Sequence, residues 1–141
     1  WQVIHLCGKG NLDGSLKDLK GYVQYEYVSS QLKDLFAVSD LMISRAGANS
    51  ICEILALRKP NILIPLSAAA SRGDQILNAE SFRKQGFSEV LEEEKLTDQS
   101  LLALIGKVHA HRQDYIKAME AAKASDSIGT ILALLNEAGG F

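Results

Sequence analysis

The chain has 141 residues, of which 47% are hydrophobic and 23% charged, and its formal net charge is −2. This length is enough to bury a core, so we expect a single domain over residues 1–141. The near-neutral charge offers no positive surface to nucleic acid, which we exclude as a partner. No apolar run reaches the ~18 residues of a membrane span, and the start of the chain is not a signal peptide.

The first residues read as the middle of a strand. They contain no initiator Met. We therefore expect the chain to be a piece of a longer protein.

Short apolar runs alternate with segments of helical spacing through the first 91 residues. Because parallel strands need crossover connections, this alternation predicts an α/β fold with a parallel sheet and helices on both faces. The predicted strands are residues 1–7, 22–28, a run that starts at Leu41, 61–66 and 87–91. The predicted helices are residues 12–19, a segment that carries Leu32, Leu35 and Phe36, residues 49–57, and residues 74–85.

From Thr97 onward the sequence predicts helices without strands between them. Three groups of apolar residues recur at helical spacing, and we expect these helices to close the domain. The groups are Leu101, Leu102, Leu104, Ile105 and Val108; Ile116 and Met119; and Ile128, Ile131, Leu132 and Leu135.

The stretch from Leu41 to Leu55 predicts a buried strand, a tight glycine turn and a new helix. The small residues Ala46, Gly47 and Ala48 let a ligand come close to the backbone. The first N–H groups of the helix then point at that ligand unpaired, and phosphate is the usual occupant of such a position. We therefore predict an anion site at this turn.

Two charged residues flank the turn. Glu53 lies about one turn inside the helix, where its carboxylate can accept hydrogen bonds from a pair of sugar hydroxyls, so phosphate and ribose together predict a nucleotide. The spacing from Ser50 to Glu53 equally fits a capping box, in which Glu53 only bonds the N–H of Ser50. Arg45 ends an apolar strand, where a cation is rarely placed for packing; it is either the partner of a carboxylate or the neighbour of a phosphate.

Asp74 and Gln75 open the helix that follows a loop of small residues. Asp74 also fits a carboxylate that merely favours a helix start. The amide of Gln75 both donates and accepts, which suits sugar hydroxyls. Since ligands of open parallel sheets bind beyond the carboxyl ends of the strands, we expect these loops to face one cleft.

The remaining polar candidates have simpler interpretations. We expect His5 to be a hydrogen-bonded core histidine and Gly8–Gly10 to be a turn. Cys7 and Cys52 lack metal-ligand spacing and are expected to be small buried residues. No metal site is expected, and the chain contains no Asp-x-Asp motif.

Several motifs occur in one order along nearly the whole chain. They are His5-Leu-Cys-Gly-Lys-Gly10, Tyr27-Val28, Ser44-Arg-Ala-Gly-Ala48 followed by Glu53, Pro60 and Pro65, and Asp74-Gln75 with Asn78-Ala79. Together they resemble the carboxyl-terminal half of the MurG family, the glycosyltransferases that add N-acetylglucosamine from UDP-N-acetylglucosamine to lipid I and so form lipid II. The order of several spaced motifs is more specific than any one of them.

The resemblance implies a GT-B architecture of two Rossmann-like domains, with this chain as the carboxyl-terminal, donor-binding half. It implies an inverting, metal-independent hexosyltransferase without a cofactor. Such an enzyme is cytoplasmic and peripheral to the inner face of the cell membrane. Lipid I and the membrane would be contacted through the amino-terminal half, which this chain lacks, so we expect no catalytic residue here.

The resemblance also assigns roles. In the family the backbone at the Val28 position pairs with uracil, Glu53 takes the ribose hydroxyls, and the Gln75 position contacts N-acetylglucosamine, whereas family members often carry a second Gln in place of Asp74. The predicted substrate-binding residues are Val28, Arg45, Ala46, Gly47, Ala48, Asn49, Ser50, Ile51, Cys52, Glu53, Asp74 and Gln75.

Two alternatives stay open. One is a non-catalytic donor-binding subunit that needs a separate membrane partner. The other is a fragment of a UDP-N-acetylglucosamine 2-epimerase, which shares the architecture.

Overall fold

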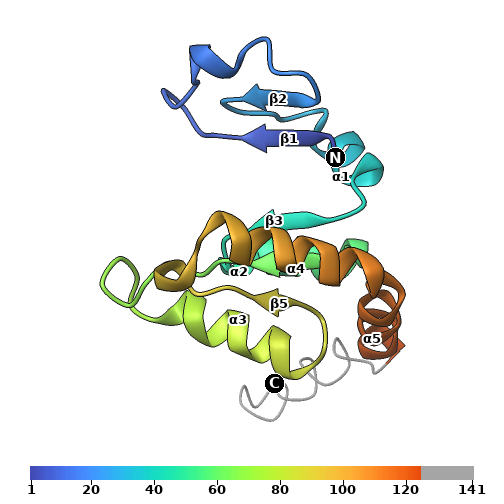
Figure 1. The fold of residues 1–141 in the computed structure, drawn as a ribbon. Helices are drawn as coiled ribbons and strands as arrows, with labels where there is room; N and C mark the ends of the chain where they lie inside the picture. Colours follow the sequence, from blue (N-terminus) through green and yellow to red (C-terminus); the bar gives the residue numbers. More distant parts are fainter. Residues whose placement is uncertain (125–141) are drawn as a thin grey trace, which may run out of the picture. The chain divides into compact units, whose positions relative to one another are not determined.

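The structure, a computed structural model, describes residues 1–124 and forms two compact units (Figure 1). Unit 1 is Trp1–Ser39, and unit 2 begins at Asp40. The strands of each unit pair in parallel, β1 with β2 and β3 with β4 with β5. This confirms the parallel α/β fold that the sequence predicts.

Unit 1 is a strand pair with one helix. In the sheet, Val3 lies opposite Tyr22 and Leu6 opposite Tyr25. Its elements are β1 (Val3–Leu6), the 3₁₀ turn η1 (Gly14–Leu16), β2 (Tyr22–Tyr25) and α1 (Leu32–Val38).

The connection between β1 and β2 is not the helix predicted over residues 12–19. Asp13 caps η1, and its Oδ1 accepts from the backbone N–H of Ser15 at 2.9 Å and from the Ser15 hydroxyl at 2.6 Å. The side chain of Gln24 bonds the N–H of Asp13 at 3.0 Å and its carbonyl at 2.6 Å. These side-chain bonds satisfy the backbone outside a helix, so the leucine spacing yields only one 3₁₀ turn.

Unit 2 follows the predicted alternation more closely. Met42 of β3 lies opposite Asn61 of β4, and Ile62 of β4 lies opposite Glu89 of β5. The elements are β3 (Met42–Ser44), α2 (Ala48–Leu57), β4 (Asn61–Leu63), α3 (Asp74–Lys84), β5 (Glu89–Val90), the 3₁₀ turn η2 (Glu93–Lys95), α4 (Asp98–Ala110) and α5 (Arg112–Ala124).

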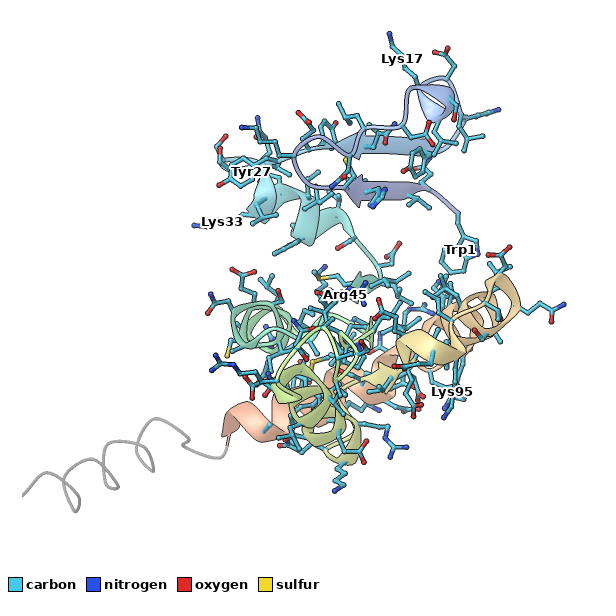
Figure 2. All side chains as sticks on the ribbon, turned by 90° about the vertical axis from the view of Figure 1, so that its left-hand side faces the viewer. Trp1, Lys17, Tyr27, Lys33, Arg45 and Lys95 are labelled. Atoms are coloured by element: carbon cyan, nitrogen blue, oxygen red, sulfur yellow. The ribbon has the colours of Figure 1, made fainter. Side chains whose placement is uncertain are left out.

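The core of unit 2 surrounds β4, the central strand, whose three residues are all buried. α4 packs against β4, α3 packs against β5, and α2 and α4 lie on opposite faces of the sheet (Figures 1 and 2). Apolar burial of this kind contributes ~25 cal/mol per Å² removed from water. The buried apolar residues are Ala46, Ile51, Ile54, Ile62, Leu63, Ile64, Ala79, Phe82, Phe87, Leu91, Val108, Tyr115 and Met119.

The fourth strand is shorter than predicted, because the backbone after Ile64 bonds other partners than the neighbouring strands. The N–H of Ile64 still bonds the carbonyl of Ser44 at 2.8 Å. Pro65 has no N–H to donate, and the N–H of Leu66 bonds the side-chain Oε1 of Gln75 at 3.1 Å. The chain therefore leaves the sheet at Pro65.

The first two helices predicted after Thr97 are confirmed as α4 and α5. The third, marked by Ile128 to Leu135, lies outside the described residues. Among residues 1–124, no helix combines the length and the apolar character needed to cross a membrane.

A polar cluster ties the closing helices to the sheet. The Oε1 atom of Glu89 in β5 lies 2.8 Å from Nζ of Lys107 in α4 and accepts from the Tyr115 hydroxyl of α5 at 2.7 Å. Burial acts to raise the pKa of the Glu89 carboxyl, but the hydrogen bonds from Lys107 and Tyr115 outweigh it, and the pKa lies below its ordinary value of 4.5. Burial and Glu89 raise the pKa of Tyr115.

We expect Glu89→Gln to lower the free energy of unfolding by about 1–3 kcal/mol at neutral pH, because a charge-assisted bond is lost. A carboxyl whose pKa is lowered by folding stabilises the fold above its unfolded value and loses that contribution as the pH falls through the folded value. The stability of the unaltered chain should therefore fall below about pH 4.5 more steeply than that of Glu89→Gln. Urea unfolding between pH 7 and pH 3 measures this, and parallel curves for the two proteins would contradict it.

Candidate nucleotide-sugar site

The carboxyl ends of β3, β4 and β5 share one edge of the unit 2 sheet, because the three strands are parallel. In Figure 1 this edge lies at the left, where the chain also enters α2 and α3. Figure 2 looks onto the edge, with Arg45 labelled. Of the predicted site residues of unit 2, Arg45 to Ser50, Asp74 and Gln75 lie at this edge, where α2 and α3 begin. Ile51 is buried in the core, and Cys52 and Glu53 lie further along α2.

The turn between β3 and α2 is tightly held. Ala46 is completely buried, and its carbonyl accepts from Nδ2 of Asn78 in α3 at 3.0 Å. Gly47 is the N-cap residue of α2 with φ −66°, and a Cβ at this position would lie 4.0 Å from Nε2 of Gln75. The backbone conformation therefore does not require glycine, but the amide of Gln75 comes close to the turn.

The amino end of α2 has no side-chain cap. The first helical hydrogen bond joins the N–H of Ile51 to the carbonyl of Gly47 at 3.1 Å. The N–H groups of Ala48, Asn49 and Ser50 therefore have no acceptor inside the helix, and the helix dipole adds partial positive charge at the same place. This is the anion-binding geometry that the sequence predicted.

The structure rules out one of the two interpretations of Glu53. α2 begins at Ala48 with Gly47 as its N-cap, so Ser50 is the third helical residue and Glu53 the sixth. A capping box needs its acid at the third helical position, so the capping interpretation is wrong. The Glu53 side chain is exposed, and within residues 1–124 its carboxylate makes no hydrogen bond or ion pair. It is available to a ligand.

Arg45 has a carboxylate partner, which was one of its two predicted roles. Its Nη2 lies 2.8 Å from Oε1 of Glu93, and its Nη1 donates to the carbonyl of Ile64 at 3.3 Å. The second oxygen of Glu93 accepts from the backbone N–H of Ser67 at 3.3 Å. The hydrogen bond from Arg45, followed by that from Ser67, lowers the pKa of Glu93. Arg45 remains half exposed and can also reach an anion.

Gln75 uses only part of its hydrogen-bonding capacity. Its Oε1 accepts from the N–H of Leu66, whereas within residues 1–124 its Nε2 has no acceptor. The donor faces Gly47 and is free for a ligand at this edge. Asp74 is the exposed first residue of α3, which favours the helix start as predicted.

Sequence reasoning did not nominate Asn78 or Glu93 as site residues, although both hold the site together. Asn78 lies one helical turn after Gln75, which is a signal that the sequence offered. Glu93 belongs to a run of three glutamates that follows the last predicted strand. Its position at this edge of the sheet was therefore predictable from the sequence, but its pairing with Arg45 was not.

The burial expected of three other residues is wrong. Cys7 in unit 1 is only half-buried. Cys52 is exposed on α2 instead of buried. His5 is hydrogen-bonded as expected, with Nδ1 2.7 Å from the Tyr22 hydroxyl, but it is exposed on the short β1 strand instead of lying in a core. Val28 lies in unit 1 and is half-buried. No group of three or more potential metal ligands occurs in the part of the chain that the structure describes.

Comparison with proteins of known sequence gives close relatives. A relative from Lachnoclostridium phytofermentans, named UDP-N-acetylglucosamine--N-acetylmuramyl-(pentapeptide) pyrophosphoryl-undecaprenol N-acetylglucosamine transferase, is 58% identical over 97% of this chain, which covers 39% of the relative. A protein of the same name from Clostridium perfringens strain SM101 is 56% identical over 97% of this chain and 38% of its own length. The chain thus spans about two fifths of the curated relatives it matches.

Two solved glycosyltransferase structures share the fold. The glycosyltransferase of kitacinnamycin superposes with a TM-score of 0.72 at 20% identity, over 86% of this chain and 30% of its own. MurG of Acinetobacter baumannii superposes with a TM-score of 0.70 at 17% identity, over 96% of this chain and 40% of its own. The chain therefore has the fold of GT-B carboxyl-terminal domains, as the sequence predicted.

The family profile that describes the Glycosyltransferase family 28 C-terminal domain matches residues 1–131. The parallel α/β fold, the uncapped helix start at the edge of the sheet and the relatives named as N-acetylglucosamine transferases agree with this match. This chain belongs to the glycosyltransferase family 28 C-terminal domains.

Proposed function

We propose that the chain binds UDP-N-acetylglucosamine as the donor half of an inverting, metal-independent N-acetylglucosaminyltransferase of lipid II synthesis in peptidoglycan formation. The names of its relatives support the substrate and the reaction. The observation that carries the proposal is the uncapped amino end of α2. In the sequence it lies between Arg45 and Glu53, whose carboxylate has no partner among residues 1–124.

The donor's diphosphate binds at the amino end of α2. Three backbone N–H groups, Ala48 to Ser50, donate to phosphate oxygens, and the half-exposed guanidinium of Arg45 adds positive charge beside them. When the glycosidic bond breaks, the leaving UDP gains negative charge. Donors that are already in place stabilise that charge without reorganisation, so a metal ion is not required for this role.

The other parts of the donor are assigned to the further residues that the resemblance names. The segment from Ala48 to Glu53 lines the diphosphate and ribose, with Glu53 accepting from the ribose hydroxyls. The free Nε2 donor of Gln75, with Asp74 beside it, binds the N-acetylglucosamine ring. The backbone at Val28 pairs with uracil.

The acceptor and the catalytic base belong to the rest of the enzyme. The relatives are more than twice as long as this chain, and their further residues would supply the wall that binds lipid I. We propose that the whole protein acts in the cytoplasm at the inner face of the membrane, with membrane contact outside the present chain. Since the relatives are named as transferases, we favour a transferase over an epimerase or a non-catalytic subunit.

We expect Glu53→Ala to weaken UDP binding by about 1–3 kcal/mol, because a charged acceptor of the ribose hydroxyls is lost. Thermal stability should change by less than about 0.5 kcal/mol, since Glu53 is exposed and caps nothing. Titration calorimetry and thermal unfolding measure the two effects. Glu94→Ala, an exposed carboxylate on η2, is the control and should leave both unchanged. A loss of stability with unaltered affinity would contradict the ribose role.

We expect Gln75→Glu to reduce the affinity for UDP-N-acetylglucosamine more than that for UDP, by about tenfold in the ratio of the two dissociation constants. The substitution keeps an oxygen for the N–H of Leu66 and removes only the Nε2 donor. Its added negative charge acts on both ligands, so the ratio isolates the sugar contact. Parallel calorimetric titrations with the two ligands give this ratio, and an unchanged ratio would count against a sugar contact at Gln75.

We expect the 141-residue chain by itself to bind the donor but to transfer nothing, because attack at the anomeric carbon needs an acceptor hydroxyl and a base on the face opposite the diphosphate. The assay is UDP release from UDP-N-acetylglucosamine with and without a lipid I analogue, with a full-length relative as positive control. Turnover that depends on the acceptor would refute this division of labour.

A further inference from the structure

Glu93 joins the three segments that end at the carboxyl edge of the unit 2 sheet. It is the first residue of η2, and two residues separate it from the end of β5. One of its oxygens pairs with Arg45 at the end of β3, at 2.8 Å, and the other accepts from the N–H of Ser67 in the loop after β4, at 3.3 Å. No residue on the α2 helix takes part in this link.

The contacts with Glu93 and Ile64 restrict the orientation of the Arg45 guanidinium but do not occupy all of its N–H donors. Arginine has five N–H donors in a planar fork. Nη2 faces Glu93 and Nη1 faces the carbonyl of Ile64, so each terminal nitrogen has one partner and further donors remain. The pair is partly exposed, with 48% of the Arg45 side chain and 35% of the Glu93 side chain accessible. Water therefore weakens the electrostatic effect of the Glu93 carboxylate on the charge of Arg45. The contacts still fix the orientation of the guanidinium.

A long arginine side chain loses rotamer freedom when it binds a phosphate. An arginine that is already held in one orientation loses less, which strengthens binding. The contact with Ser67 extends the same effect to the backbone of the loop that leads to Gln75. Glu93 thus acts on Arg45 and on the loop that leads to Gln75, and both residues are proposed to bind the nucleotide sugar.

We propose that Glu93 is a positioning residue for the donor's diphosphate: it holds Arg45 and the Ser67 loop in place at the carboxyl edge of the unit 2 sheet, the edge from which α2 starts. The inference rests on the proposed function and names a residue that acts on the ligand only through Arg45 and Ser67.

The neighbouring glutamates provide matched comparisons. Glu92 pairs with Lys95 at 2.8 Å, and Glu94 is exposed with no hydrogen bond or ion pair in residues 1–124. Glu94→Gln changes the net charge by the same amount as Glu93→Gln and lies one residue away. An effect of total charge alone would be the same for both variants.

The test is a double-mutant cycle on UDP affinity, measured by calorimetry on the 141-residue chain with Arg45→Ala, Glu93→Ala and the double variant. We expect Glu93→Ala to weaken UDP binding about three- to tenfold, Glu93→Gln to weaken it less because an acceptor for Arg45 remains, and Glu94→Gln to have no effect. In the Arg45→Ala background the effect of Glu93→Ala should fall to less than about twofold.

The outcomes separate the two proposals. If the unaltered chain does not bind UDP at millimolar concentration, the proposed function fails and this inference fails with it. If the unaltered chain binds UDP but Glu93→Ala leaves the affinity unchanged or strengthens it, the positioning role alone is overturned. An equal loss in both backgrounds also overturns it, because a merely structural role of Glu93 would not depend on Arg45. Thermal unfolding of each variant confirms that the compared proteins are folded.

Discussion

The parallel pairing of β3, β4 and β5 is the constraint on which the proposed site depends. Parallel strands place their carboxyl ends at one edge, so the end of β3, the loop after β4 and the turn after β5 meet there although they are far apart in the sequence. Each crossover helix must then start from that same edge. The uncapped start of α2 and the entry to α3 are consequences of the strand direction.

Side chains convert this shared edge into a defined geometry. Asn78 fixes the carbonyl of Ala46, and Gln75 holds the N–H of Leu66 through the oxygen of its amide. Glu93 connects Arg45 with the backbone of Ser67. The contacts of Asn78 and Glu93 join segments that follow different strands, whereas Gln75 fixes the loop that leads from β4 into its own helix. Each contact therefore contributes more to the shape of the edge than to the stability of a single element. Among residues 1–124, the donors that remain unpaired are suited to an anion: the first N–H groups of α2, the remaining guanidinium donors and the Nε2 of Gln75.

A second polar cluster in unit 2 differs from the proposed site, because its side chains pair with one another. Glu89, Lys107 and Tyr115 satisfy one another between β5, α4 and α5, and they lock the helices onto the sheet. At the carboxyl edge, by contrast, Glu53 has no protein partner within the described residues, and Arg45 is only partly engaged. Unpaired polar groups at a sheet edge cost little when they are exposed to water, and they are the groups that a ligand can use.

The sequence by itself determined the class of fold, because the alternation of strands and helices is a local pattern and parallel pairing follows from it. It also determined the strand, turn and helix around Gly47, since glycine and small residues between apolar segments act locally. Tertiary structure alone decided the rest. α2 starts at Ala48, one residue before the predicted start and too early for a capping box at Ser50, because Asn78 of α3 fixes the turn through the carbonyl of the buried Ala46. Arg45 found its partner in Glu93, a residue 48 positions away that only the pairing of β3 with β4 and of β4 with β5 brings near. The leucine spacing of residues 12–19 did not make a helix, because Gln24 in the next strand binds the backbone of Asp13. Local periodicity cannot report such contacts, since they depend on segments that meet only after the chain has folded.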